Sequence, residues 1–165
     1  MRRLAIAVAI AAVGIAGCGD DSDNPNGPSN TTIFTVQLAS TNEVPPVSNA
    51  EAGSLGTAVI TIHRDTNVID FAVSMNSFPT GAVLRAAHIH GPNGPAGVNQ
   101  PVLVDTGLTP GTAITIGSDG RGTFTFTGVP ASADNISQIT ANPQNFYFNV
   151  HSNANTGGVI RGQLR

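Results

Sequence analysis

The chain contains no lysine and no tryptophan, and charged residues make up only 10% of its 165 residues. Its seven basic residues, all arginines, stand against ten acidic ones. Proteins that bind nucleic acid or anionic lipid electrostatically need clustered basic side chains. The composition therefore excludes a nucleic-acid-binding surface and a polybasic membrane-binding patch, and we expect no nucleic acid among the partners.

Cysteine is nearly absent as well, because Cys18 is the only one in the sequence. It precedes every segment with the pattern of a strand. The folded part therefore has no disulfide, no thiolate metal site and no cysteine nucleophile. A domain of this kind depends on its apolar core, and about 135 residues can bury a core of sufficient size.

The only long apolar run is Leu4–Ile15, which follows two arginines and is shorter than the ~20 residues that a membrane-spanning helix needs. The pattern predicts a signal peptide over residues 1–17. It ends in Ile-Ala-Gly-Cys, which resembles the lipobox of bacterial lipoproteins. The resemblance implies that the peptide is removed and Cys18 is acylated. The alternative is an ordinary signal peptide in which the cysteine is incidental.

We therefore expect an extracytoplasmic lipoprotein of the bacterial cell envelope, anchored in the lipid bilayer through acylated Cys18. The rest of residues 18–30 is polar and rich in Asp, Asn, Gly and Pro, with nothing apolar to bury. Such a composition predicts a disordered linker. Residues 31–165 are then the single folded domain.

From Thr31 onward, short apolar and β-branched stretches alternate with polar residues, and clusters of Gly, Pro, Asn and Asp separate them. A helical turn capped by Asp134 is predicted within residues 132–141. The pattern predicts an all-β fold, a single antiparallel Greek-key β-sandwich. Eight or nine strands are expected, from the stretches Ile33–Leu38, Thr57–His63, Asn67–Val73, Val83–His90, Val102–Val104, Ala113–Ile116, Gly122–Thr127, Phe146–His151 and Val159–Leu164.

Three histidines carry the only plausible site chemistry. His88 and His90 are two residues apart, so they share one face of a strand, and His151 ends another strand. Alternation places all three on outer faces, with Leu84 beside the first two. Three neutral imidazoles suit copper or zinc, with a fourth position left for water. The alternative is a structural role, in which the rings bond to loop backbone. His63 lies at a turn, and we expect it to be exposed.

Arg161 lies in a glycine-flanked terminal strand and has two readings. It faces a substrate anion near the histidines, or it serves the structure by pairing with a carboxylate or with carbonyl groups. Glu43 is the candidate carboxylate, because it precedes a rigid Val-Pro-Pro turn and has no other evident role. The structural role is the preferred interpretation.

The ordered motifs of the chain resemble the chordin-type (CHRD) domain. The resemblance runs from about Phe34 to Leu164 and implies an immunoglobulin-like β-fold with no settled activity, in secreted or lipid-anchored bacterial proteins. The motifs that carry it are Phe34-Thr35-Val36-Gln37-Leu38 with Asn42-Glu43-Val44-Pro45-Pro46-Val47, Ala87-His88-Ile89-His90-Gly91-Pro92, Gly97-Val98-Asn99-Gln100-Pro101-Val102, Phe148-Asn149-Val150-His151-Ser152 and Gly158-Val159-Ile160-Arg161-Gly162-Gln163-Leu164.

A weaker resemblance is to copper-zinc superoxide dismutase, also a Greek-key β-sandwich with a His-x-His strand, a later histidine and a functional arginine. His88, His90 and His151 match the histidines, and Arg161 matches the arginine loosely. The loop from 91 to 100 lacks the bridging histidine, no zinc ligand set is evident, and both disulfide cysteines are missing. With these parts missing, the resemblance implies at most a site in which three histidines bind a single metal ion.

Two functions remain open from the sequence. One is a membrane-tethered CHRD module that binds or supports an unknown protein or small ligand without catalysis. The other is a copper- or zinc-binding domain, with redox activity as one use of the metal. No Gly-x-Ser-x-Gly elbow is present, no catalytic residue is assigned, and the balance favours a protein that is not an enzyme.

Overall fold

The computed structural model describes residues 30–165, so the predicted signal peptide, Cys18 and nearly all of the linker lie outside the described residues. Within that range no helix is long and apolar enough to cross a membrane. The strands are β1 (Thr31–Ala39), β2 (Leu55–His63), β3 (Val68–Asn76), β4 (Val83–His90), β5 (Val102–Asp105), β6 (Ile114–Thr115), β7 (Gly122–Pro130), β8 (Tyr147–Ser152) and β9 (Ile160–Gln163); the helix is α1 (Ala133–Ala141), and short 3-10 turns span Ser40–Asn42, Pro110–Thr112 and Pro143–Asn145.

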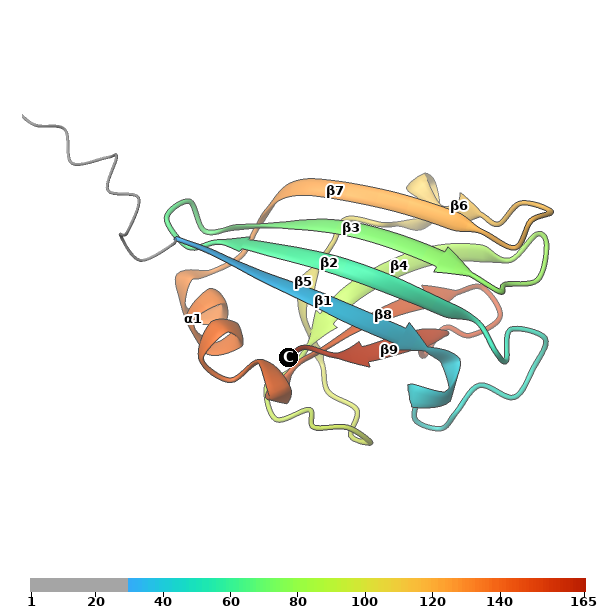
Figure 1. Cartoon of the computed structure of the whole chain (residues 1–165), viewed down its shortest axis with the longest axis horizontal. Helices are drawn as coiled ribbons and strands as arrows, with labels where there is room; N and C mark the ends of the chain where they lie inside the picture. Colours follow the sequence, from blue (N-terminus) through green and yellow to red (C-terminus); the bar gives the residue numbers. More distant parts are fainter. Residues whose placement is uncertain (1–29) are drawn as a thin grey trace, which may run out of the picture.

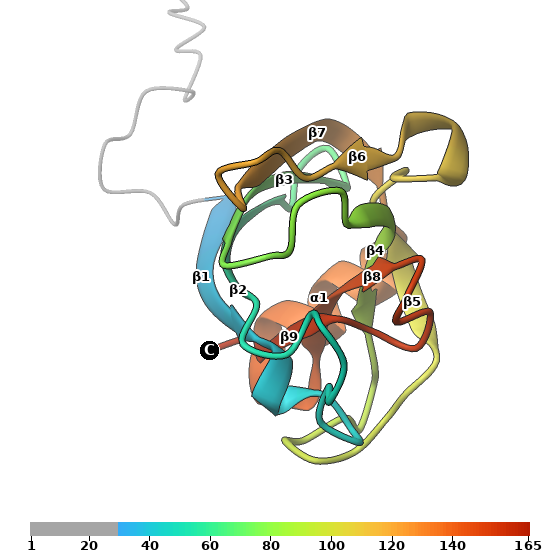
Figure 2. The ribbon, with the colours of Figure 1, turned by 90° about the vertical axis from the view of Figure 1, so that its right-hand side faces the viewer.

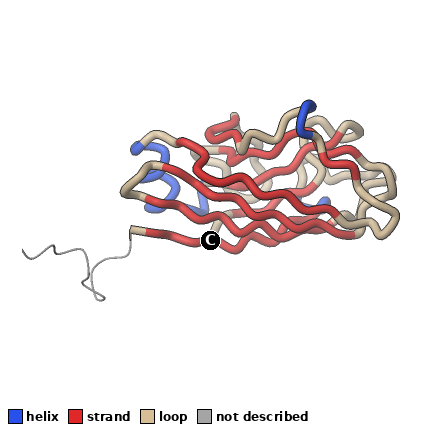
Figure 3. Tube along the Cα trace, turned by 90° about the horizontal axis from the view of Figure 1, so that it is seen from above, coloured by secondary structure: helices blue, strands red, loops and turns tan. Residues whose placement is uncertain are grey.

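The strands form one antiparallel sheet in the order β5-β4-β8-β9-β1-β2-β3-β7, with β6 paired to β4 (Figure 1). Figure 2, which looks along the strands, shows the sheet curled around one interior. Figure 3 shows the strands running side by side, with the helical segments at the margins. The prediction of an all-β antiparallel sandwich is confirmed, and the two layers are continuous because β9 meets β1 at the pair Ala39 and Arg161.

Strand alternation builds the core as the sequence predicts. On β1, Phe34, Val36 and Leu38 are buried and the residues between them are exposed. The same alternation continues along β2 and β3, and β2 pairs over its whole length with β1 on one side and β3 on the other. At the junction of the layers, Gly162 of β9 packs directly on the backbone of Gln37, where a Cβ would overlap. Glycine is required there by the close approach of two strands.

The predicted alternation is wrong at one place, the start of β4. Leu84 is fully buried, together with Ala87 and Ile89, and does not share the face of His88 and His90. The pairing of β4 with β8 shifts register between Leu84 and Ala86. An extra residue in one strand reverses which residues face the core. The sequence carries no glycine or proline to mark this bulge.

The helix is longer than the single turn expected and has a different cap. It spans Ala133–Ala141, and the Ser132 hydroxyl accepts a hydrogen bond from the Asn135 amide. Asp134 lies in the first turn, where an acidic side chain interacts favourably with the helix dipole. Ile136 and Ile139 bury one side of the helix against the core.

The outer face of β4, β8 and β9 is covered, which strand parity alone does not reveal. All six residues of β8 are buried, including Tyr147, Asn149 and His151, which point away from the core. Their cover consists of the loops 91–101 and 153–158, whose backbone bonds to side chains on this face. The polar face therefore becomes a second interior rather than a solvated surface.

Candidate metal site

The pairing of β4 with β8 brings the three predicted histidines together. His88 lies opposite Asn149 and His90 opposite Tyr147, while His151 lies opposite Ala86 and diagonally from His88. One ring nitrogen from each histidine lies within 4.8 Å of the others. His90 and His151 are buried, and the side chain of His88 is 14% exposed.

Loop carbonyl groups set the tautomers of two of these rings. His90 Nδ1 donates to the Gln100 carbonyl at 2.8 Å, and His151 Nδ1 donates to the Thr156 carbonyl at 3.0 Å. A carbonyl oxygen only accepts, so each Nδ1 carries the hydrogen and each Nε2 keeps its lone pair. His90 Nε2 is buried and has no hydrogen-bond partner in the described part of the chain.

The third ring completes the arrangement. His88 Nδ1 lies 3.1 Å from His151 Nε2, and His88 Nε2 lies 3.7 Å from the Asp105 carboxylate. Asp105 favours a hydrogen on Nε2 of His88. The lone pair on His88 Nδ1 then faces the lone pair on His151 Nε2. A neutral His88 with the opposite tautomer would instead donate directly to His151.

The three rings have the features of ligands held in place by their second nitrogens. Metal-bound histidines usually donate their other N–H to a carbonyl or a carboxylate, which fixes ring orientation. Nitrogens bound at about 2.0–2.1 Å to one tetrahedral ion lie about 3.3–3.4 Å apart. The nitrogens of His88 and His151, 3.1 Å apart, are already close to that separation. No pair among the three nitrogens is more than 4.8 Å apart, so the rings must approach by at most about 1.5 Å. Of the donor types present, imidazoles suit copper and zinc.

Burial also keeps these histidines uncharged. Desolvation and, to a smaller extent, the neighbouring His88 lower the pKa of His151 to about 4, against the Thr156 hydrogen bond. Burial likewise lowers the pKa values of His88 and His90, partly offset by Asp105 and by the Gln100 carbonyl. Neutral imidazole is the form that ligates a metal.

His63 is separate from this cluster, but it ends β2 and is half-buried rather than exposed. Its Nε2 lies 2.9 Å from an Asp70 carboxylate oxygen across the β2–β3 hairpin, and the side chain is 32% exposed. The hydrogen bond from the Gly128 amide and the His63 contact lower the pKa of Asp70. His63 therefore serves as a matched control for the three clustered histidines.

Arg161 lies on the same covered face, but its guanidinium bonds to the loop after His90 and not to the histidines. It is 2% exposed, and its guanidinium donates to Asn99 Oδ1 at 2.8 Å and to the Val98 carbonyl at 2.6 Å. Its central carbon stacks 3.6 Å from the centre of the Tyr147 ring. Arg161 thus fastens the loop after His90 to the sheet.

Glu43 is buried near Arg161, but the predicted carboxylate pair is wrong, because no salt bridge joins the two in the described residues and Arg161 bonds to Asn99 and Val98 instead. Burial raises its pKa to about 7, although the Arg161 charge and a hydrogen bond from Asn149 lower it. That bond, from Asn149 Nδ2 to Glu43 Oε2, is 3.4 Å long, and Glu43 Oε1 has no partner in the described residues. Gly158, with a φ of 139°, lies against both side chains, where a Cβ would overlap them.

Several residues that shape the site were not singled out from the sequence. Tyr147 and Asn149 alternate with His151 on β8, so strand parity places them on its face. Gln100 and Thr156 contribute backbone carbonyls, and any residue type supplies those. Only the folded loops reveal their role.

The comparisons with known proteins identify a family. A family model described as CHRD domain matches residues 34–164, which confirms the extent expected from the motifs. Neither the curated proteins nor the solved structures contained a match to the chain. The likeness to superoxide dismutase therefore remains an interpretation of the histidine spacing.

Proposed function

The chain belongs to the CHRD domain family, and we propose that it is a lipid-anchored binding module that holds one copper or zinc ion on His88, His90 and His151. The family fits an extracellular binding or structural module. The metal and the anchor are the specific parts of the proposal, and they rest on separate observations.

The unpartnered Nε2 of His90 carries the metal proposal. A buried polar atom without a partner costs free energy, unless a ligand satisfies it. This atom lies among two further lone-pair nitrogens, while the other nitrogens of the rings are engaged by Gln100, Thr156 and Asp105. One ion bound among the three satisfies all of these lone pairs together.

Three imidazoles leave room for a further ligand. In zinc sites with three protein ligands, the fourth position holds water, and a copper ion in such a site exchanges electrons as well. The residues of this chain contribute orientation, through the loop carbonyls, and exclusion of solvent, through the cover over β8. We assign no reaction to the site.

The anchor rests on the sequence. The Ile-Ala-Gly-Cys junction at Cys18 supports acylation, and the polar residues 19–30 support a linker between the bilayer and β1. Together they support an extracytoplasmic location in a bacterial cell envelope, with the lipid bilayer as the partner of Cys18.

A module without metal is the second candidate. The 3.1 Å approach of His88 Nδ1 to His151 Nε2 favours it, because a direct hydrogen bond between these rings would give the cluster a structural role. His90 Nε2 would then remain buried and unsatisfied, which is why the metal proposal is preferred.

Metal analysis distinguishes the two candidates. Full-length protein purified in detergent, stripped with chelator and dialysed against copper(II) or zinc(II), is expected to retain one ion per chain. The matched control is the His63→Ala variant, which should retain the same amount. Retention that is equally high in a variant with all three clustered histidines changed to Ala would disprove the proposal.

A further inference from the structure

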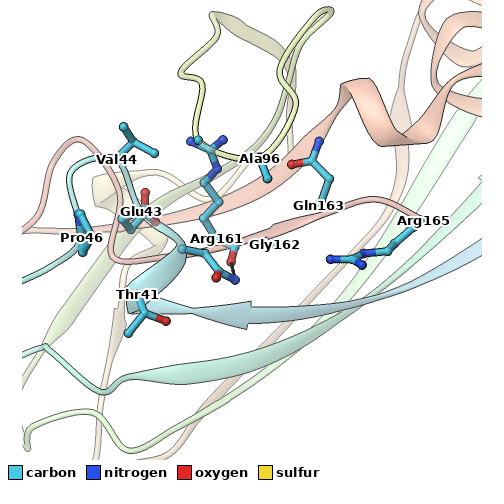
Figure 4. A pocket seen from close by; sticks show the side chains of 11 residues that line it. Thr41, Glu43, Val44, Pro46, Ala96, Arg161, Gly162, Gln163 and Arg165 are labelled. Carbon is cyan, nitrogen blue, oxygen red and sulfur yellow. Dashed lines mark hydrogen bonds between the residues drawn. The ribbon is translucent and has the colours of Figure 1, made fainter.

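A cavity of about 400 Å³ lies beside β9, and none of the three clustered histidines lines it. Its walls come from the segment 41–46 after β1, from Ala96 and Gly97 in the loop over the sheet, and from β9 (Figure 4). Its lining includes two arginines, Arg161 and Arg165, and one acidic side chain, that of Glu43. Neither the metal proposal nor the anchor uses this cavity.

The charge of Arg161 is not neutralised by direct contact. Both of its hydrogen-bond acceptors, Asn99 Oδ1 and the Val98 carbonyl, are neutral. Between residues 30 and 165, no carboxylate oxygen lies within 4.0 Å of its guanidinium. A buried cation without a counter-ion is costly, so an anion near it is stabilised.

Glu43 does not cancel this positive field. The residue is only 5% exposed, and its Oε1 has no hydrogen-bond partner in the described part of the chain. Because burial raises its pKa to about 7, the carboxyl carries on average less than a full negative charge at neutral pH. The two arginines therefore outweigh it, and the protonated carboxyl is itself a hydrogen-bond donor.

Arg165 supplies a group that can contact a ligand. Unlike Arg161 it is exposed, and Figure 4 shows its side chain running back along β9 toward Gly162. A guanidinium binds a carboxylate through two parallel hydrogen bonds. We propose that this cavity binds a small organic acid, whose carboxylate pairs with Arg165 in the field of Arg161.

The first test compares a uronic acid with its neutral sugar. Amide NMR spectra of full-length protein in detergent are recorded during titration with galacturonate, with acetate and with galactose. We expect saturable shifts at Thr41, Gly97 and Gly162 with both acids and none with galactose. The Arg165→Gln variant should bind galacturonate at least about tenfold more weakly, because a hydrogen bond to a charged group is lost.

The Arg121→Gln variant is the matched control, since Arg121 is an exposed arginine outside the cavity, and its affinity should equal that of the wild type. Unchanged affinity in Arg165→Gln would overturn the proposal, as would equal shifts with galactose or no saturable shift. Binding of an acidic peptide alone would overturn it in favour of a protein partner. A variant with all three clustered histidines changed to Ala should still bind galacturonate, so failure of the metal proposal is distinguishable.

Discussion

His90 and Tyr147 lie face to face across β4 and β8, with ring planes 2° apart and centroids separated by 4.8 Å. Tyr147 occupies the middle strand of three, and Arg161 from β9 stacks 3.6 Å from its ring centroid. Its hydroxyl bonds to the Gln100 backbone, the same residue whose carbonyl orients His90. Tyr147 thus joins the histidine cluster to the loop and to the buried arginine.

Replacing Tyr147 should therefore destabilise the domain, by an amount that depends on whether the ring is kept. Tyr147→Phe keeps the ring and loses the hydrogen bonds to Gln100, for an expected cost of about 1 kcal/mol. Tyr147→Leu also loses both stacking interactions, and we expect a cost of about 3 kcal/mol. Urea denaturation measures both values, and equal losses in the two variants would show that stacking contributes nothing.

Each single change of His88, His90 or His151 to Ala should weaken copper or zinc binding by at least about tenfold. Loss of a residue that only orients a metal ligand already weakens metal affinity by about 10–100-fold, and these changes remove a ligand itself. His63→Ala should leave affinity unchanged, since His63 contacts Asp70 instead. Competition with a chromogenic chelator measures the affinities. If one clustered histidine behaves like His63, the site has fewer than three protein ligands.

Glu43 should make the domain less stable as pH rises. Its pKa in the folded state, about 7, lies above the ordinary glutamate value of 4.5, so between these pH values the folded state holds a proton that the unfolded state has released. Stability then falls from pH 4.5 to 7, by at most about 3 kcal/mol, and stays level above pH 7. The difference in unfolding free energy between wild type and Glu43→Gln, measured by urea denaturation across pH 4.5–8, should show this slope; a flat difference would contradict it.

Arg161→Leu should destabilise the domain by several kcal/mol, because Asn99 and the Val98 carbonyl lose their donors and Glu43 loses the positive charge that lowers its pKa. Arg161→Lys keeps the charge but not the planar fork, and we expect an intermediate loss. Thermal unfolding of the three proteins provides the comparison. A melting temperature unchanged in Arg161→Leu would refute a structural role.

Cys18→Ser should move the protein out of the membrane fraction, because acyl chains are the expected membrane contact. The measurement is the distribution of the protein between soluble and membrane fractions after a carbonate wash. The unchanged protein, processed in parallel, should remain with the membranes. A serine variant that still sediments with them would disprove lipid anchoring at this residue.

The sequence predicts which histidines come together better than it predicts what surrounds them. Spacing alone places His88 and His90 on one face, because the side-chain period of a strand is two and the pairing of β4 with β8 keeps its register between them. The same rule fails for Leu84, where a register shift intervenes. The loop partners of His90 and His151 are not predicted for another reason. They are backbone carbonyls, which every residue type carries, so the sequence does not mark them.

The amino-acid sequence by itself determined the family, the strands, their inward residues and the three histidines, since these follow from local periodicity and ordered motifs. Only the tertiary structure decided that Arg161 and Glu43 are buried and that Arg161 bonds to residues more than 60 positions away. The physical reason is that burial of an outer face depends on where distant loops fold back. Periodicity assigns a residue to a face of its strand, whereas the packing of other segments decides whether that face meets water.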